Sequence, residues 1–412
     1  MQANNSFGVI LEKESHPLRK LNILYHHRTQ GRGAEGTHIV SIIHGFEKLG
    51  HSVTLVSPPG IDPLKEIGAP PVDKTRVKTK GIQGLWKLIS KYVPNPVFEL
   101  IEIAYNVPAA RRLEKCIQEK KFDFIFERYA FYLLAGSYIS KKYGIPLIVE
   151  ANEVSGIEDR ARKQSFKRLC DLFEKKLFRQ AKAIFTVSSH LKRMIEEKKI
   201  DGNKVFVLPN AIDLDNVKIT RDVNKLRESL GLNGKIVIGF GGWFDHWDRL
   251  DFLLDVYIEL ARENKDIAVL LIGDGPAVAT LKDTIRERGL EKSVVFTGAV
   301  PKKDMFSYLS LLDIAILPHS NKFGSPVILF EIMGLKKPIV APRLAPIEDV
   351  LTDKVNALLF NPLDKAGCME ALRQFIDSEE KRRIFSDNSF ELLVREHTWV
   401  NNSKKIVDTA IQ

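Results

Sequence analysis

Residues 21–56 read LNILYHHRTQGRGAEGTHIVSIIHGFEKLGHSVTLV, and this stretch decides the fold class. A short apolar run at 21–26 is followed by a glycine-rich turn and then by apolar residues at helical spacing. These residues are Ile39, Ile42, Ile43, Phe46 and Leu49. A second apolar run at 52–56 leads into a proline- and glycine-containing turn. The order strand, loop, helix, strand is the unit of a parallel sheet, so the pattern predicts an α/β protein.

The same rhythm continues along the chain and divides it in two. Apolar runs at FDFIFERYA, IPLIVEAN, AIFTVS and KVFVLPNAI alternate with helical patterns up to residue 212. A second series begins at KIVIGFGG and runs through IAVLLIGDGP, SVVFTGAV, DIAILPHS, KPIVAPR and ALLFNP. A chain of 412 residues is long enough for two cores. We predict two doubly wound, Rossmann-like domains, 1–212 and 213–395, with a ligand cleft between them, and a helix at 396–412 that packs back toward the first domain.

The residues GRGAEG, 31–36, match the G-x-G-x-x-G fingerprint of dinucleotide-binding folds. In that fingerprint the first glycine directly follows the strand, and an acidic residue about 20 positions further on holds the ribose. Here residues 27–30 intervene, and the second strand ends at 56 without an acid, so no dinucleotide cofactor is expected. The glycines either form only a tight turn, or they expose backbone N–H groups around Gly33 and Gly36 to an anion in the cleft.

Composition and charge restrict the class of protein. Hydrophobic residues make up 44% and charged residues 28% of the chain, as in a globular protein. Three widely spaced cysteines, Cys116, Cys170 and Cys368, argue against a zinc site or a disulfide scaffold and suggest a reducing, cytoplasmic compartment. The N-terminus lacks a secretory pattern, and no apolar run approaches the ~18 residues of a spanning helix. A net charge of +10 calls for anionic partners, yet no nucleic-acid-binding pattern is present.

The second half carries the more specific motifs. They run from LIGDGP at 271–276 through GAVPKK at 298–303 and SPVILFE at 325–331 to LKKPIVAPR at 335–343. In order and spacing they resemble the nucleotide-binding half of retaining glycosyltransferases of family 4, which have the two-domain GT-B fold. The stretches GRGAEGTHIV, FERYAFYLL and AIFTVSSHLKRMI extend the resemblance to the first half, so that it covers nearly the whole chain from Leu21.

The resemblance implies a set of donor-binding residues. Glu331 matches the glutamate that, at the start of a helix, binds the ribose hydroxyls of the nucleotide sugar in this family. Ser325, which precedes that helix, joins the donor-binding set. Gly275 and Val300 match the loops beside the base and the ribose, where backbone groups recognise the base. The alternative for Glu331 is a first-turn residue that only complements the helix dipole.

Two positions depart from the family pattern. The family's E-x7-E motif has a second glutamate eight positions before the ribose glutamate, where this chain has Phe323. A subgroup that makes bacterial surface polysaccharides shows the same SP…FE form without the first acid. The arginine and lysine that hold the diphosphate are also absent after the first strand of the second domain. There, GFGGWFDHWDRL leaves Arg249 as the candidate cation, with Gly241 and Gly242 allowing close backbone approach. Lys322 is a second phosphate candidate.

The resemblance further implies a retaining reaction. In the front-face route usually drawn for this fold, the diphosphate leaves, an oxocarbenium-like sugar forms, and the acceptor hydroxyl enters from the same side. Such a route needs charge stabilisation more than a strong base. The catalytic candidates are Glu150 and Asn152, which end the strand IPLIVEAN, and His38, which lies near a helix start, where a histidine is more often a structural cap.

Two further segments bear on ligands. Asp213-Leu214-Asp215 is a D-x-D, the metal motif of the other large glycosyltransferase fold, but it falls between the domains, so no metal is expected. The basic segment KTRVKTKGIQGLWKLISKY, 74–92, places Leu85, Leu88, Ile89 and Tyr92 on one helical face. That face either packs on its own domain or lies on an anionic membrane, which would make the protein peripheral on the inner face of the cell membrane.

The combined expectation is a metal-independent, retaining hexosyltransferase. It moves a sugar from a nucleoside-diphosphate sugar to a glycan or polyprenyl-linked acceptor in bacterial lipopolysaccharide or exopolysaccharide synthesis. One alternative is a catalytically degenerate, nucleotide-sugar-binding partner subunit, for which Phe323 and LKKP argue. The other is a GT-B-fold nucleotide-sugar epimerase, which would need several acids and histidines in the cleft.

Overall fold

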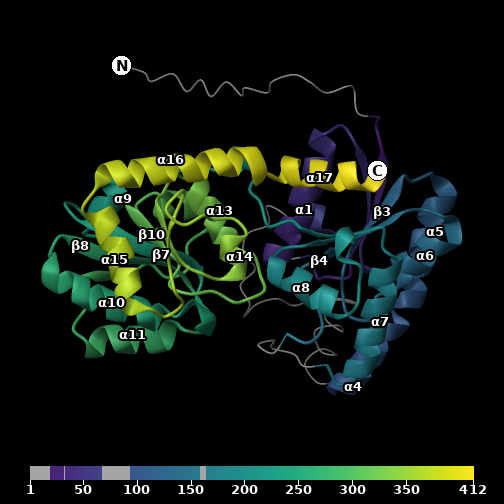
Figure 1. Ribbon diagram of the computed structural model, residues 1–412, viewed down its shortest axis with the longest axis horizontal. Helices are drawn as coiled ribbons and strands as arrows, with labels where there is room; N and C mark the ends of the chain where they lie inside the picture. Colours follow the sequence, from purple (N-terminus) through teal and green to yellow (C-terminus); the bar gives the residue numbers. More distant parts are fainter. Residues whose placement is uncertain (1–18, 32, 67–92, 158–163) are drawn as a thin grey trace.

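The computed structural model describes residues 19–31, 33–66, 93–157 and 164–412. It contains two α/β domains that lie next to each other, and each is built around a parallel sheet with helices on its faces (Figure 1). The predicted fold class, two Rossmann-like domains of the GT-B type, is confirmed.

The first domain contains a parallel sheet in the order β2-β1-β3-β4-β5-β6. Its strands are β1 (Asn22–His26), β2 (Ser52–Val56), β3 (Phe124–Arg128), β4 (Leu147–Ala151), β5 (Ala183–Thr186) and β6 (Val205–Val207). Its helices are α1 (Gly33–Lys48), α2 (Pro63–Glu66), α4 (Asn95–Ala104), α5 (Asn106–Glu119), α6 (Ala135–Tyr143), α7 (Lys167–Gln180) and α8 (Ser189–Glu197).

Alternate strand residues build two cores on the two faces of this sheet. Ile23 and Tyr25 face a cluster that includes apolar residues of α1, whereas Leu24 faces a second cluster with residues of α5 to α8. Successive side chains of a strand point to opposite faces, so both faces of the sheet are covered and its strands are almost entirely apolar.

The second domain repeats this plan with a parallel sheet in the order β12-β11-β10-β7-β8-β9. Its strands are β7 (Ile236–Trp243), β8 (Ile267–Asp274), β9 (Val294–Phe296), β10 (Ile314–Ile316), β11 (Ile339–Pro342) and β12 (Leu358–Phe360). Its helices are α9 (Val223–Ser229), α10 (Leu250–Glu263), α11 (Val278–Glu287), α12 (Met305–Leu309), α13 (Val327–Gly334), α14 (Ala345–Glu348), α15 (Lys365–Ile376) and α16 (Glu379–Glu396).

Strand order places the sites for ligands. In each sheet the first strand of the domain lies inside the sheet, with β2 and β3 on either side of β1 and with β10 and β8 on either side of β7. The strands that follow in sequence are added first on one side of these strands and then on the other, so the loops that lead to the two sides diverge. The carboxyl ends of β1, β3 and β4 in one domain, and of β7, β8 and β10 in the other, are therefore the expected ligand-binding edges.

The chain returns to the first domain at its C-terminus. Helix α16 lies along the second domain, and α17 (Trp399–Ile411) packs on α1 (Figure 1). Trp399, Ile406 and Val407 belong to the apolar cluster of the first domain, and the Ser403 hydroxyl donates to the Ile42 carbonyl at 3.1 Å. The two segments that connect the domains also pair with each other, because Ile212 bridges to Thr398.

Candidate functional site

The glycine-rich turn joins β1 to α1. Gly33 begins α1 at a φ of +62°, and a Cβ added to it would have open space around it. Gly36 differs, since an added Cβ would lie 2.1 Å from the Gly31 carbonyl oxygen. Gly36 is therefore required by close contact inside the protein, whereas Gly33 is the position of the pair at which a ligand could approach the backbone.

Glycines on the second domain show the same division. An added Cβ on Gly241 would lie 2.6 Å from Leu309 Cδ2, and one on Gly275 would lie 2.4 Å from the Phe244 carbonyl oxygen. Internal packing thus restricts both positions, Gly241 inside β7 against a leucine side chain and Gly275 after β8 against the backbone. Gly242, with a φ of +141° and open space beside it, is the glycine that leaves room for another molecule.

The predicted donor cation Arg249 is engaged elsewhere. It caps α10 in a left-handed conformation with a φ of +48°. Its Nε and Nη2 donate to the two carboxylate oxygens of Asp251 at 2.9 and 2.8 Å. In the described structure Asp251 therefore competes with a phosphate for this guanidinium, although the pair is partly exposed. The second candidate, Lys322, is exposed and lies near His190 in α8, whose pKa is lowered by burial, by Arg193 and by Lys322.

Glu331 occupies a different part of its helix from the one expected. It is the fifth residue of α13, a turn further in than a first-turn position, so the alternative of a simple complement to the helix dipole does not hold. Burial raises the pKa of its carboxyl to about 7, and the charge of Lys302 partly offsets this. Within the described part of the chain, no hydrogen-bond donor meets this carboxylate. Because the residue is only half-buried, its carboxylate is accessible to a ligand that carries hydroxyl donors.

Phe323, at the position of the absent family glutamate, contacts the first domain. Its side chain packs against the apolar cluster of that domain, and its carbonyl oxygen accepts from the Ser188 hydroxyl at 2.7 Å. The loss of the acid therefore coincides with a gain of apolar contact between the domains. The residue acts as an interdomain contact, a role that sequence spacing alone did not indicate.

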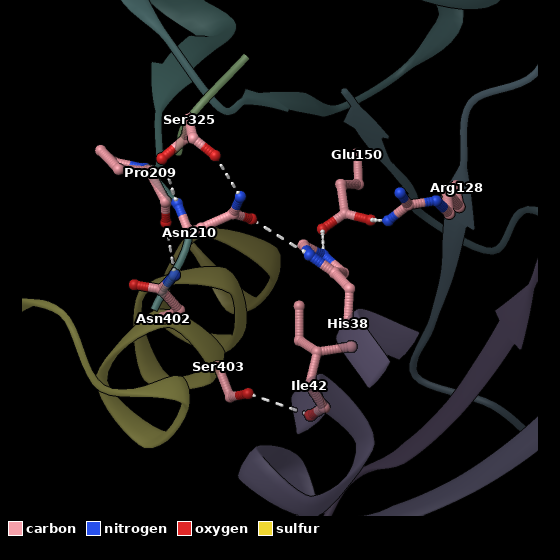
Figure 2. A network of polar contacts seen from close by, with 9 residues as sticks. All are labelled: His38, Ile42, Arg128, Glu150, Pro209, Asn210, Ser325, Asn402 and Ser403. Atoms are coloured by element: carbon pink, nitrogen blue, oxygen red, sulfur yellow. Dashed lines mark hydrogen bonds and ion pairs between the residues drawn. The ribbon is translucent and has the colours of Figure 1, made fainter. Parts of the chain in front are cut away.

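A buried polar network occupies the first domain at the edge facing the second (Figure 2). Arg128 ends β3 and Glu150 lies on β4, and the strand register places them side by side. The Arg128 guanidinium donates to one oxygen of Glu150 at 2.8 Å, and His38 of α1 contacts the other oxygen through Nε2 at 2.6 Å. The three side chains are at most 11% exposed.

Asn210 extends this network to the second domain (Figure 2). Its side-chain Nδ2 donates to the Ser325 carbonyl at 2.7 Å, which turns its Oδ1 toward His38 Nδ1 at 3.2 Å. The backbone N–H of Asn210 donates to the Ser325 hydroxyl at 3.0 Å. Both ring nitrogens of His38 thus face oxygen acceptors, and the polar atoms of Ser325 face the interdomain segment.

The network sets the charge of Glu150. Burial opposes ionisation, but His38 and Arg128 outweigh it and lower the pKa of Glu150 to about 2. Both carboxylate oxygens are occupied by these neighbours. Glu150 and His38 are therefore held by each other rather than offered to a substrate, which leaves Arg128 and Asn152 as the network members that reach open space.

A cavity of about 600 Å³ opens at the carboxyl ends of β1, β3 and β4. Its lining includes Arg28, Glu35, Arg128 and Asn152, with a further wall from α4. When the amide oxygen of Asn152 is oriented toward Arg128, it accepts from Nη2 at 2.8 Å. Sequence reasoning identified Asn152 but missed Arg28 and Arg128. Arg128 directly follows the run FDFIFE and Arg28 lies two positions after LNILYH, and these positions were the available signal, because parallel strands end at one common edge.

Val300 is half-buried in the loop after β9, two residues before Lys302. The side-chain Nζ of Lys302 donates to the Thr37 hydroxyl in α1 at 3.0 Å, so this loop reaches across to the first domain. Predicted donor-side loops and the glycine-rich turn of α1 therefore meet at the boundary between the domains.

The D-x-D segment is bound to α1. Lys48 contacts Asp213 at 3.2 Å and Asp215 at 2.7 Å. Among the residues that the structure describes, no cluster of three or more His, Cys, Asp or Glu side chains could hold a metal ion. In the same residues, no helix is both long and apolar enough to cross a membrane. The predicted basic membrane-binding face at 85–92 lies outside the described residues.

Comparison with known families matches both halves of the chain. Residues 35–216 match the family described as Glycosyltransferase Family 4, and residues 222–392 match the family described as Glycosyl transferases group 1. The two matches cover the two structural domains nearly end to end.

Individual relatives are distant. The 2-deoxystreptamine glucosyltransferase of Streptomyces kanamyceticus is 26% identical over 254 residues, which are 60% of this chain and 65% of that protein. The matched region thus spans just under two thirds of that relative's length. The O-antigen chain mannosyltransferase C of Escherichia coli is 22% identical over 298 residues, 71% of this chain and 76% of that protein.

A solved structure shares the whole arrangement. Anabaena HepE in complex with UDP-glucose superposes with a TM-score of 0.66 at 18% identity, over 94% of this chain and 99% of that one. At this identity the likeness is one of fold.

Proposed function

The chain belongs to the glycosyltransferases of the GT-B fold, with a family 4 first half and a group 1 second half, and from this premise we propose that it transfers a sugar from a nucleoside-diphosphate sugar. The acceptor is a glycan or a polyprenyl-linked glycan of surface polysaccharide or glycolipid synthesis. Transfer proceeds with retention of configuration and without a metal. The O-antigen enzyme among the relatives supports the pathway class, and the neighbour solved with UDP-glucose supports the donor class.

The observation that carries the proposal is the Glu331 carboxyl. It is half-buried on α13, is affected by the charge of Lys302, and has no hydrogen-bond donor within the described chain. Two vicinal hydroxyls of a ribose would supply the missing donors, and a carboxylate accepts such a pair in a defined orientation. The open space at Gly242 and the backbone groups of the loop at Val300 are the proposed contacts for the rest of the nucleotide.

The acceptor occupies the cavity of the first domain. Arg28 pairs with Glu102 at 2.8 Å and Arg128 pairs with Glu150, and the lining also contains Glu35, Glu99 and Glu153, so the walls are polar and richer in carboxylates than in cations. Such a lining suits a hydroxyl-rich sugar, whose many donors and acceptors can bind these groups without a large net charge. Asn152, with both an amide donor and an acceptor, is positioned to orient the hydroxyl that attacks.

The network of Figure 2 explains how the reaction could proceed without a free base on this wall. His38 and Glu150 hold Arg128 and α1 in place, which keeps the acceptor and the donor in a fixed relation. The leaving diphosphate then accepts the proton of the acceptor hydroxyl in the front-face route. Glu150 and His38 thus act by positioning groups that touch substrate.

Nucleotide-sugar turnover tests the proposal. Purified protein is incubated with UDP-, GDP- and dTDP-sugars in turn, and release of nucleoside diphosphate is followed with and without a membrane glycolipid extract. We expect release from one donor class and its loss in Glu331→Ala, while Glu348→Ala, an exposed acid on α14, keeps the wild-type rate. Absence of both turnover and nucleotide-sugar binding would refute the proposal.

Phe323 favours one alternative, a partner subunit that binds a nucleotide sugar without turnover. In that case the same protein would bind one nucleotide sugar tightly in calorimetry, and no acceptor extract would cause release of nucleoside diphosphate. We further propose a peripheral site of action at the inner face of the cell membrane, resting on the basic segment 74–92. Failure to float with anionic liposomes at low salt would rule out that location.

A further inference from the structure

A donor diphosphate brings negative charge into the cleft, and its leaving group gains more as the sugar departs. Family members neutralise it with an arginine and a lysine that this chain lacks after β7. The replacement candidate Arg249 already binds Asp251 through two hydrogen bonds. Arg128 is committed to Glu150, and Lys322 lies beside α8. The cleft therefore needs a cation from another element.

Lys302 is a cation at the right place. It directly follows the turn 298–301, and its Nζ lies 3.0 Å from the Thr37 hydroxyl in the second turn of α1. Its charge also acts on Glu331. Within the described chain Lys302 forms no ion pair, so its charge is not neutralised by a neighbouring carboxylate.

Lys302 lies between the residues proposed to bind the ribose and the glycine-rich turn proposed to face the sugar diphosphate. The ribose is assigned to Glu331, and the open backbone at Gly33 lies at the beginning of α1, one turn from Thr37. A diphosphate links ribose to sugar, so it must run from the second domain toward the first. Lys302 comes from the second domain and already reaches α1.

We propose that Lys302 binds the diphosphate of the donor and stabilises it as the leaving group, in place of the basic pair of the family. This inference rests on the proposed function. When a nucleotide binds, the Lys302 ammonium exchanges its contact with Thr37 for phosphate oxygens, which are stronger acceptors for a charged donor. The same exchange ties the two domains together around the donor.

A structural alternative is that Lys302 only holds the domains together through Thr37. Thr37→Val removes that hydroxyl with little change in shape and leaves the Lys302 ammonium intact. Lys302→Gln removes the charge and keeps much of the length. Lys303→Gln, on the exposed next residue, is the matched control for loss of one positive charge.

The experiment compares affinities within one nucleoside series. Calorimetry measures binding of uridine, UMP and UDP, with the guanosine and thymidine series run in parallel to find the base that binds. We expect Lys302→Gln to weaken diphosphate binding by about tenfold or more and nucleoside binding by less than about twofold. Thr37→Val and Lys303→Gln are expected to keep the wild-type ratio of the two affinities.

Three outcomes are informative. If Lys302→Gln and Thr37→Val weaken the affinity for the nucleoside diphosphate equally, Lys302 acts only as a contact between the domains, and the inference is overturned. A wild-type preference for diphosphate over nucleoside that persists in Lys302→Gln would overturn it as well, while leaving the proposed function intact. Absence of any nucleotide binding by the wild-type protein would instead refute the proposed function.

Discussion

Replacing Glu150 by glutamine tests the buried network directly. The change keeps the size of the side chain but removes the negative charge that faces His38 and Arg128. Those two groups lower the pKa of Glu150 from 4.5 to about 2 against the opposing effect of burial. That lowering corresponds to about 3 kcal/mol of folding free energy at neutral pH. We therefore expect Glu150→Gln to reduce the free energy of unfolding by about this amount at pH 7, since Arg128 remains buried without its counter-charge.

The sign of the pH dependence follows from the direction of the shift. A carboxyl with a lowered folded-state pKa stabilises the protein fully above its unfolded pKa of 4.5 and loses this contribution as the pH falls toward 2. The difference between wild type and variant should therefore shrink to roughly 1 kcal/mol at pH 3. In contrast to a general loss of packing, which would be equal at both pH values, this loss is specific to the charge.

Urea-induced unfolding, followed by far-UV circular dichroism at pH 7 and pH 3, measures both differences. Glu114→Gln is the matched control, because Glu114 pairs with Lys142 on the surface and exposed ion pairs contribute little. Equal stability of Glu150→Gln and wild type at pH 7 would refute the reasoning. A difference that stays constant between the two pH values would show that the charge is not its source.

Two further predictions follow from burial and from backbone geometry. Glu331→Gln is expected to raise the free energy of unfolding of the ligand-free protein at pH 8. Burial raises the folded-state pKa of this carboxyl to about 7, so the wild type loses stability as the pH rises from 4.5 through 7, whereas the glutamine variant does not. Nucleotide-sugar affinity in calorimetry should fall, and a loss of stability in the variant would contradict the argument. Gly36→Ala is expected to lower the Tm far more than Gly33→Ala. The added Cβ at position 36 would lie 2.1 Å from the Gly31 carbonyl oxygen, whereas alanine at position 33 meets open space and loses only ~1 kcal/mol of stability through the positive φ. Equal changes in Tm would contradict the contact argument.

The fold was predictable because its signal is local. Each strand is a short apolar run followed by a turn and a helical pattern, and the alternation recurs in both halves. Both domains and their parallel sheets follow from that repetition together with the rules for parallel connections. Strand register was not predictable in this way, and it is the register that places Arg128 beside Glu150.

The candidate site was predictable only where it depends on strand ends. Glu150 and Asn152 are predicted because they follow an apolar run; Asn152 lines the cavity, whereas Glu150 is buried beside Arg128. Contacts between domains have no local pattern, so Phe323 was noted as a missing acid and not as a packing residue. Lys302 was passed over for the same reason, since its neighbour Thr37 is 265 positions away in sequence. The catalytic and donor-binding roles of these residues stay predictions.

The return of the chain to α1 affects the order in which the protein can fold during synthesis. Trp399, Ile406 and Val407 complete the apolar cluster of the first domain, although the whole second domain precedes them in the sequence. A nascent chain that has already produced residues 1–212 therefore still exposes the face of α1 that α17 covers. The first domain begins to be made before the second, yet its core is completed only by a helix that follows the second domain in sequence. Emergence of α17, rather than of residues 19–212, is therefore the event that closes the first core.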